Sequence, residues 1–364
     1  MSGKKRAVLI TGVAHTWGSR LASLLEADPE FDALIGIDYM KPEKPFARME
    51  FFQIEPHHPL LPELLKVTGV DTVCHLLFED AYAPSEEVFD LNVMGTMDLL
   101  AACGAGETPR VVLMSDAKVY GAVAENPHFL TEDTDFLGSY RHPYVIHRME
   151  VEKIADRFSR QNPLPKITML RFANILGFGV DTPMARYLSP QMVPTVFGYD
   201  PMMQLTHVKD VTAALYHAVK NDVPGTFNIA GDGFLPLCQM LRLGKKVSLP
   251  FGAPFLRLGG KIFQKTPIPD SLPIEEAFLK FPCLGDTARM KNVLGFSPQF
   301  TTRETIEDFL ENQRLAKYLP KRSRSQADPK AAEKLQDYLM AKRRAQDYLT
   351  ELIESFNKES GHDQ

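Results

Sequence analysis

The sequence predicts an α/β fold: a doubly wound parallel sheet with a smaller C-terminal lobe and an added helical tail. Short apolar runs rich in β-branched residues alternate with stretches of helical periodicity along most of the chain. The first run ends in a glycine-bearing turn, and the second ends at an acidic residue. This alternation is typical of βαβ units, whose strands lie parallel and are covered by helices on both faces.

The opening unit, residues 7–38, predicts a dinucleotide-binding turn. Residues 7–12 form an apolar strand that ends in glycine, residues 19–25 have helical periodicity, and residues 33–38 form a second strand that stops at Asp38. In such a unit the backbone N–H groups of the turn meet a pyrophosphate at the positive end of the helix dipole. The acid accepts hydrogen bonds from ribose hydroxyls. Asp38 favours NAD over NADP because its carboxylate would repel a 2′-phosphate.

The turn departs from the usual glycine spacing at one position. The pattern Thr-Gly-x-x-Gly-x-x-Gly is matched by Thr11, Gly12 and Gly18, but His15 stands where the middle glycine would be. A side chain there must either point away from the phosphates or narrow the gap that receives them. We expect a functional but altered cofactor cradle; a glycine turn with a purely structural role is the alternative.

The later elements follow in the same rhythm. Residues 50–55 read as a strand that ends at Glu55, where we expect an acid to meet the adenine amino group. Residues 70–77 read as a buried strand of a parallel sheet, with His75 packed rather than catalytic. The remaining predicted elements are helices over 90–100, 144–154 and 206–219 and strands over 110–115, 167–174 and 225–231.

Three parts are expected along the chain. Residues 1–177 form the dinucleotide-binding domain, and residues 178–318 form a substrate lobe interleaved with the last strands of the sheet. Within this lobe, residues 182–205 mix prolines with methionines and aromatic residues, which suits either a substrate pocket or the cover of a core. Residues 319–364 form a charged linker and an amphipathic helix.

The sequence leaves the role of the C-terminal tail, residues 319–364, open. Apolar residues between positions 328 and 356 fall near heptad spacing, and charged residues occupy the other face. Such a helix packs on its own body, mediates a homodimer or docks a protein partner, or lies on a membrane surface.

Composition excludes several classes of protein. The 364 residues contain 44% hydrophobic and 24% charged residues, which is ordinary for a globular protein, and the net charge of −5 gives no footprint for nucleic acid. No apolar leader precedes the first strand, and no stretch of about 18 apolar residues suggests a membrane span. The four cysteines show neither metal spacing nor a disulfide framework. We therefore expect a cytoplasmic protein with reduced thiols and no metal.

A series of short motifs lies in order and at matching spacing between roughly residues 6 and 312. The motifs are Thr11-Gly12 with Gly18, Asp38, His75-Leu76, Asn92-Val93-x-Gly95-Thr96, Val119-Tyr120-Gly121, Tyr144, Leu170-Arg171-x-x-Asn174-x-x-Gly177 and His207-Val208-x-Asp210-Val211. With these motifs the chain resembles the extended short-chain dehydrogenase/reductase family, in particular its NAD-dependent epimerase/dehydratase group, the UDP-glucose 4-epimerase-like branch. The tail beyond about residue 320 is not covered.

The resemblance implies a Rossmann fold, NAD as cofactor and hydride transfer with a tyrosine as general acid/base. In this family a lysine binds the nicotinamide ribose and lowers the pKa of the tyrosine, and a serine or threonine hydroxyl contacts the substrate oxygen. Tyr144 matches the tyrosine, but the lysine position is Arg148 and the hydroxyl position is Asp116. Arginine keeps the charge with a different geometry, and a carboxylate donates no hydrogen bond to a carbonyl unless it is protonated. Ser115, one residue earlier, should face the other side of its strand.

These observations define the predicted site. Tyr144, Arg148 and Asp116 are the predicted catalytic residues. The predicted cofactor-binding residues are Thr11, Gly12, His15, Trp17, Gly18, Asp38, Glu55, Leu76, Asn92, Ser115, Tyr144 and Arg148.

Two functions remain open from the sequence. The first is an NAD-dependent oxidoreductase or epimerase that uses Tyr144 on a small molecule. Because residues 182–205 offer only Arg186 as a cation, an apolar or lipid-linked substrate is favoured over a sugar nucleotide. The second is a catalytically impaired NAD-binding sensor or scaffold that docks a partner through its C-terminal helix. The altered residues His15, Asp116 and Arg148 support this alternative.

Overall fold

The computed structural model describes residues 6–79, 84–138, 142–252 and 273–316. The chain divides into two compact units, residues 1–310 and 311–364. The predicted tail, 319–364, and its helix at 328–356 lie outside the described residues.

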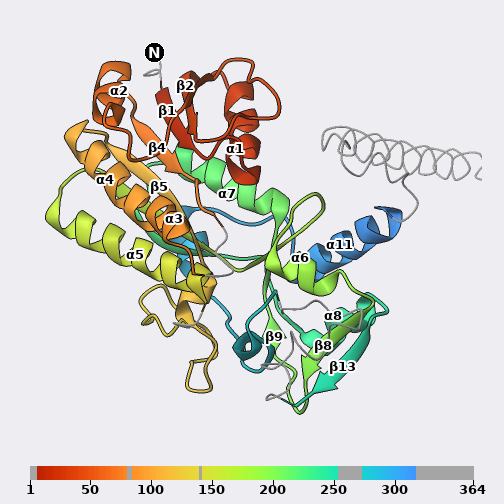
Figure 1. The fold of residues 1–364 in the computed structure, drawn as a ribbon. Helices are drawn as coiled ribbons and strands as arrows, with labels where there is room; N and C mark the ends of the chain where they lie inside the picture. Colours follow the sequence, from red (N-terminus) through yellow and green to blue (C-terminus); the bar gives the residue numbers. More distant parts are fainter. Residues whose placement is uncertain (1–5, 80–83, 139–141, 253–272, 317–364) are drawn as a thin grey trace, which may run out of the picture. The chain divides into compact units, whose positions relative to one another are not determined.

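A parallel sheet of seven strands forms the centre of the first unit (Figure 1). Its order is β11 (Gly225–Ile229), β6 (Lys166–Phe172), β5 (Arg110–Asp116), β4 (Thr72–His75), β1 (Arg6–Thr11), β2 (Phe31–Asp38) and β3 (Glu50–Gln53). The chain moves outward from β1 to β3 and then returns to the other side of β1 with β4. The strand order therefore reverses between β1 and β4, where open α/β sheets bind ligands at the carboxyl ends of their strands.

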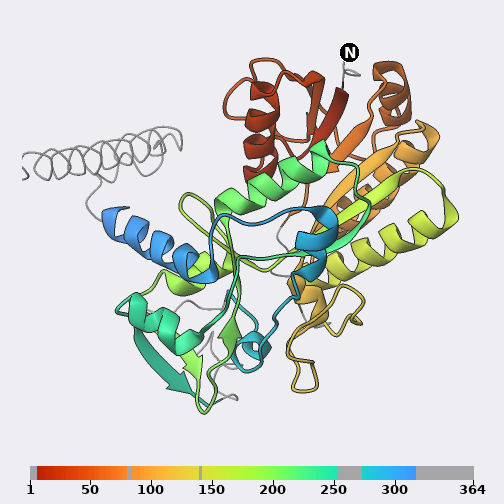
Figure 2. The ribbon, with the colours of Figure 1, turned by 180° about the vertical axis from the view of Figure 1, so that it is seen from behind.

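Helices cover both faces of the sheet because successive residues of a strand point to opposite faces and both sets are apolar. Val8 and Ile10 of β1 pack in one core layer with α1 and α7, whereas Leu9 packs in the opposite layer with α2, α4 and α5. Figure 2 shows α1 and α7 together on one face, and Figure 1 shows the other three helices. The bounds are α1 Thr16–Ala27, α2 Leu61–Thr68, α3 Glu86–Phe89, η1 Asp90–Met94, α4 Gly95–Ala105, η2 Ala117–Tyr120, α5 Pro143–Gln161 and α7 Val208–Lys220. The predicted doubly wound Rossmann-type sheet is confirmed.

The later chain adds a smaller lobe with its own apolar core, in which Met184, Tyr187, Val193 and Met240 are buried. Residues 182–205 thus cover a core for the most part, while Met184 also borders a cavity. The elements of the later chain are β7 Asn174–Leu176, α6 Pro183–Leu188, β8 Met192–Val196, β9 Met202–Met203, β10 Leu205–His207, β12 Leu235–Pro236, α8 Leu237–Leu243, β13 Val247–Phe251, η3 Glu276–Leu279, η4 Met290–Leu294 and α11 Thr302–Ala316.

One helical segment, Glu86–Ala105, has the length and mean hydropathy of a membrane span, but 44% of its apolar window is buried inside the protein. Its C-terminal part, α4, packs against α2 and α5 over the sheet. This segment therefore has the surroundings of a core helix in the helical layer of the fold.

Candidate active site

The turn between β1 and α1 is built for close packing. Gly12 has a φ of +75°, and a Cβ on it would lie 2.7 Å from the backbone nitrogen of Leu77. A Cβ on Gly18 would lie 2.1 Å from the Gly12 carbonyl oxygen. The first turn of α1 therefore lies directly against the glycine turn, and its N–H groups face the crevice at the carboxyl ends of the strands.

Asp38, at the end of β2, is fully buried and already accepts hydrogen bonds from the protein. The backbone N–H of Ala14 donates to one carboxylate oxygen at 2.9 Å, and the N–H of Met40 donates to the other at 3.0 Å. The Asp38 carboxylate therefore stabilises the glycine turn through the hydrogen bond from Ala14.

The side chain of His15 points toward Asp38 rather than into open space. Its Nε2 lies 3.6 Å from an Asp38 oxygen and 3.8 Å from a Glu79 oxygen, and the Asp38 carboxylate raises the pKa of His15 above its ordinary value. Glu79 also accepts a hydrogen bond from the hydroxyl of Tyr39. At the position where the motif has glycine, the imidazole therefore covers the acid expected to receive ribose hydroxyls.

His75 is a packed structural histidine, as expected. Its Nδ1 lies 2.7 Å from the Thr11 hydroxyl, and its Nε2 lies 3.0 Å from the Thr96 hydroxyl. Thr96 donates its own proton to the Asn92 carbonyl, so it accepts from the imidazole, and the Nε2–H tautomer satisfies all three groups. Burial, reinforced by the charge of Arg148, lowers the pKa of His75 to about 3 and keeps the ring neutral.

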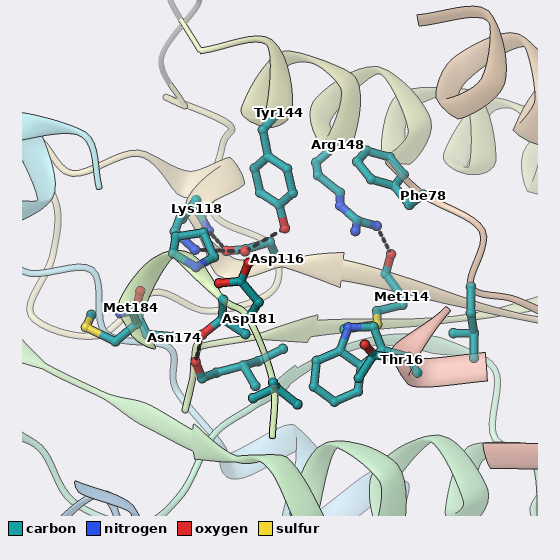
Figure 3. A pocket seen from close by; sticks show the side chains of 16 residues that line it. Thr16, Phe78, Met114, Asp116, Lys118, Tyr144, Arg148, Asn174, Asp181 and Met184 are labelled. Carbon is teal, nitrogen blue, oxygen red and sulfur yellow. Dashed lines mark hydrogen bonds and ion pairs between the residues drawn. The ribbon is translucent and has the colours of Figure 1, made fainter. Parts of the chain in front are cut away.

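A cavity of about 110 Å³ lies at the carboxyl ends of β4 and β5, beside the start of α1 (Figure 3). Side chains from the start of α1, the end of β5, helix α5 and the segment before α6 converge on it. Its lining comprises Thr16, Trp17, Leu76, Phe78, Met114, Asp116, Lys118, Tyr144, Arg148, Asn174, Ile175, Val180, Asp181, Thr182, Pro183 and Met184.

Tyr144, Asp116 and Lys118 form a hydrogen-bonded cluster in this cavity (Figure 3). The Tyr144 hydroxyl donates to Asp116 Oδ2 at 3.0 Å. Lys118 contacts the same carboxylate with its Nζ, at 2.8 and 3.1 Å, and with its backbone N–H, at 2.8 Å. The phenol therefore has a proton acceptor whose negative charge is balanced by a nearby ammonium group.

Arg148 lies one helical turn after Tyr144 but reaches a different place. Its guanidinium carbon is 3.4 Å from the ring centre of Phe78 and 5.4 Å from that of Tyr144, and one terminal nitrogen donates to the Met114 carbonyl. Only 7% of the side chain surface is exposed. The arginine is thus a buried cation beneath the cavity, and Lys118 is the cation that lies against Asp116.

Ser115, a predicted cofactor-binding residue, is not part of the cavity lining, because strand alternation turns its side chain to the other face of the sheet. Its hydroxyl donates to Glu152, a buried residue of α5, which also receives hydrogen bonds from Arg171 at 2.7 to 3.1 Å. Arg171 in turn donates to the Tyr120 hydroxyl at 2.7 Å. This network connects α5 to the sheet next to Asp116 and Tyr144.

The structure brings some predicted residues together and separates others. Five of them line the cavity: Trp17, Leu76, Asp116, Tyr144 and Arg148. Thr11, Gly12, His15, Gly18 and Asp38 form or brace the adjoining turn. Asn92 is buried against the Glu79 backbone and His147. The carboxylate oxygen Oε2 of Glu55 lies 2.9 Å from Nε2 of His57. Lys118 and Phe78 also line the cavity and were not predicted from the sequence.

The residues present fit a dinucleotide. The glycine turn leaves space that a Cβ would fill, α1 begins without an acidic residue in its first turn, and the cavity continues from this helix start to Tyr144. An anion is favoured at such a helix start. The Asp38 carboxylate already accepts hydrogen bonds from the protein backbone.

Comparisons with known proteins agree with this geometry. The model of the NAD dependent epimerase/dehydratase family matches residues 8–230. An uncharacterized protein of Mycobacterium tuberculosis is 33% identical over 333 residues, which cover 88% of each chain. A UDP-glucose 4-epimerase of Lactobacillus helveticus is 25% identical over 284 residues, covering 69% of this chain and 78% of the relative.

Solved structures show the same fold. MoeE5 in complex with UDP-glucuronic acid and NAD superposes with a TM-score of 0.65 at 21% identity, covering 85% of this chain and 99% of that chain. A UDP-glucuronic acid 4-epimerase from Bacillus cereus, in complex with UDP-glucuronic acid and NAD, gives a TM-score of 0.65 at 18% identity with the same coverage.

Proposed function

The chain belongs to the NAD-dependent epimerase/dehydratase family, and we propose that it is an NAD(H)-dependent oxidoreductase or epimerase in which Tyr144 is the acid/base. The observation that carries this proposal is the Tyr144–Asp116–Lys118 cluster, which lines one cavity with the start of α1. This arrangement supports a proton-transfer role for Tyr144 beside the turn that suits the cofactor. The altered position Asp116 is hydrogen-bonded to both Tyr144 and Lys118, which favours catalysis over a purely structural role.

The residues that would hold NAD are those of the turn and the cavity. Gly12, Gly18 and the N–H groups at the start of α1 suit its pyrophosphate, and Trp17 and Leu76 border the space beside Tyr144. Bound NAD supplies the hydride acceptor or donor of the reaction.

The chain's own groups handle the proton. When a substrate hydroxyl is oxidised, its proton passes to the Tyr144 oxygen while the phenolic proton moves to Asp116, at 3.0 Å. Lys118 balances the Asp116 carboxylate before the transfer and holds it in place. The reverse sequence returns the proton to a carbonyl oxygen during reduction.

The substrate proposed here is a small molecule with a secondary hydroxyl or carbonyl group and an adjoining apolar part. The polar end of the cavity presents Asp116 and Lys118, and Val180, Pro183 and Met184 border its other side. Arg186, the cation of this segment, lies 3.3 Å from an oxygen of Asp181. These neighbours support an apolar or lipid-linked substrate more than a free sugar nucleotide.

The first test is calorimetric titration of nucleotide-stripped protein with NAD, NADH and NADPH. We expect micromolar binding of NAD or NADH that is weakened by Asp38→Ala, with weaker binding of NADPH. Absence of binding at millimolar concentrations would overturn the proposal.

The second test concerns Tyr144 and uses UDP-glucose with NAD as the starting probe, followed by apolar secondary alcohols. Tyr144→Phe should lower NADH formation at least about a hundredfold and leave NADH affinity within about threefold, since the phenol supplies the proton transfer. Tyr199→Phe, at an exposed tyrosine, is the matched control. Full turnover by Tyr144→Phe on a substrate that the wild type converts would contradict the assignment.

A further inference from the structure

The Asp116 carboxylate has its acceptor sites filled by the protein. Its Oδ1 accepts from the backbone N–H of Lys118 at 2.8 Å and from the Lys118 ammonium at 3.1 Å. Its Oδ2 accepts from the same ammonium at 2.8 Å and from the Tyr144 hydroxyl at 3.0 Å. A carboxylate offers about four lone-pair sites, and protein donors occupy all of them. Asp116 therefore acts within the cluster, although it stands where the family resemblance expects a hydroxyl that contacts the substrate.

The Lys118 ammonium, in contrast, keeps donor capacity. An ammonium group carries three N–H donors and accepts no hydrogen bond. Within the part of the chain that the structure describes, its hydrogen bonds go to the two oxygens of Asp116, which engage at most two of these donors. The side chain is 14% exposed and lines the cavity (Figure 3). A donor of Lys118 is thus available to a group that enters the cavity.

Lys118 and Tyr144 are neighbours around one oxygen atom. The ammonium nitrogen is 2.8 Å and the phenol oxygen 3.0 Å from Asp116 Oδ2, and the same nitrogen lies 6.0 Å from the centre of the Tyr144 ring. Both side chains line the cavity. Two groups that share one oxygen on the side of Asp116 can share a second oxygen on the side of the cavity, at ordinary hydrogen-bond lengths. A substrate oxygen in that position meets a proton-transfer group and a cationic donor together.

We propose that Lys118 is a catalytic residue that donates a hydrogen bond to the reacting oxygen of the substrate, in the role of the hydroxyl that Asp116 replaces. In reduction the carbonyl carbon receives the hydride from NADH, and its oxygen takes the proton of Tyr144. Lys118 stabilises the negative charge that develops on this oxygen and keeps its own protons. Oxidation reverses these steps. This inference rests on the proposed function and adds a direct substrate contact to the charge balance that Lys118 provides for Asp116.

The two roles of Lys118 separate in a protein that lacks the Asp116 charge. A lysine that only balances Asp116 has no further function once Asp116→Asn removes the carboxylate. A lysine that contacts the substrate oxygen keeps its effect in that background. A double-mutant cycle of Asp116→Asn and Lys118→Met therefore distinguishes the two roles.

The probe for the cycle is N-cyclohexylformamide, an unreactive amide whose carbonyl oxygen imitates that of a ketone and whose ring suits the apolar side of the cavity. Its Kd is measured on the NADH complex of the full chain by fluorescence titration. Lys118→Met should weaken amide binding at least about tenfold, both alone and together with Asp116→Asn, since it removes a charged hydrogen-bond donor. Lys66→Met, at an exposed lysine of α2, is the matched control and should leave the Kd within about threefold of wild type.

Equal amide binding by Asp116→Asn with and without Lys118→Met overturns the inference and leaves Lys118 as the counter-ion of Asp116. Absence of amide binding to the wild-type NADH complex, up to the solubility limit of the probe, overturns it as well. If a methionine variant does not fold or does not bind NADH, Lys118→Gln in the same background replaces it, and its shorter uncharged side chain should give the same loss of about tenfold. Failure of the wild type to bind NADH overturns the proposed function itself, so the two failures are distinguishable.

Discussion

Replacing Glu152 with glutamine removes the carboxylate that neutralises Arg171. Both side chains are about 5% exposed or less, and three hydrogen bonds of 2.7 to 3.1 Å join them. Removing one partner of a buried ion pair costs about 3–5 kcal/mol, since the other charge stays buried and uncompensated. Glutamine keeps the shape and one acceptor oxygen, so we expect a loss of about 3 kcal/mol in the free energy of unfolding.

Urea unfolding followed by circular dichroism measures this loss, provided that the dependence on denaturant is unchanged. Glu150→Gln on the same helix is the control, because Glu150 pairs with Lys153 at an exposed site and should change stability by less than about 1 kcal/mol. The network also receives the Ser115 hydroxyl, next to Asp116, so Glu152→Gln should disturb the cluster as well as the fold. A loss equal to that of Glu150→Gln would refute the assignment of Arg171 and Glu152 as a structural ion pair.

Two further predictions concern histidines. Burial lowers the pKa of His75 from its ordinary value of 6.5 to about 3, so its contribution to stability is complete above pH 6.5 and is lost as the pH falls toward 3. About 2 kcal/mol should be lost by pH 5, measurable by urea unfolding at pH 8 and pH 5, and His75→Asn should show less of this pH dependence. His15→Gly restores the glycine of the motif and uncovers Asp38, so NADH should bind at least about threefold more tightly in a calorimetric titration; unchanged or weaker binding would count against the covering role of His15.

The sheet was predictable from the sequence because each buried strand is a short apolar run bounded by turn residues. The runs at 33–38 and 110–115 lie within β2 and β5, and the helical periodicity at 144–154 lies within α5. In a doubly wound sheet both faces of a strand are covered, so a strand has a continuous apolar run, and its short length between turn residues separates it from a buried helix. The sequence determines the ends of helices and strands less well. Helix α1, for example, begins at Thr16, three residues before its helical periodicity becomes clear.

The candidate site was predictable where strand alternation sets the direction of a side chain and not where an irregular turn sets it. Alternation along β5 places Ser115 away from the cavity, and its contact with Glu152 confirms this orientation. Lys118 was missed because residues two apart do not face each other on a helix, and the helical turn after β5 was not predicted. Its contact with Asp116 depends on the short 3₁₀ turn η2, which Asp116 caps by accepting the N–H of Lys118.

The altered positions also compensate for one another. The arrangement that the family resemblance implies places one lysine and one neutral hydroxyl near the tyrosine, which gives one net positive charge. Here a carboxylate at Asp116 stands with two cations, Lys118 and Arg148, and the sum is again one positive charge. Asp116 and Lys118 cancel each other beside the phenol, whereas Arg148 retains its charge one helical turn further along α5. The net positive charge therefore stays where the family resemblance places its lysine, one helical turn after Tyr144, with the guanidinium carbon of Arg148 5.4 Å from the centre of the phenol ring.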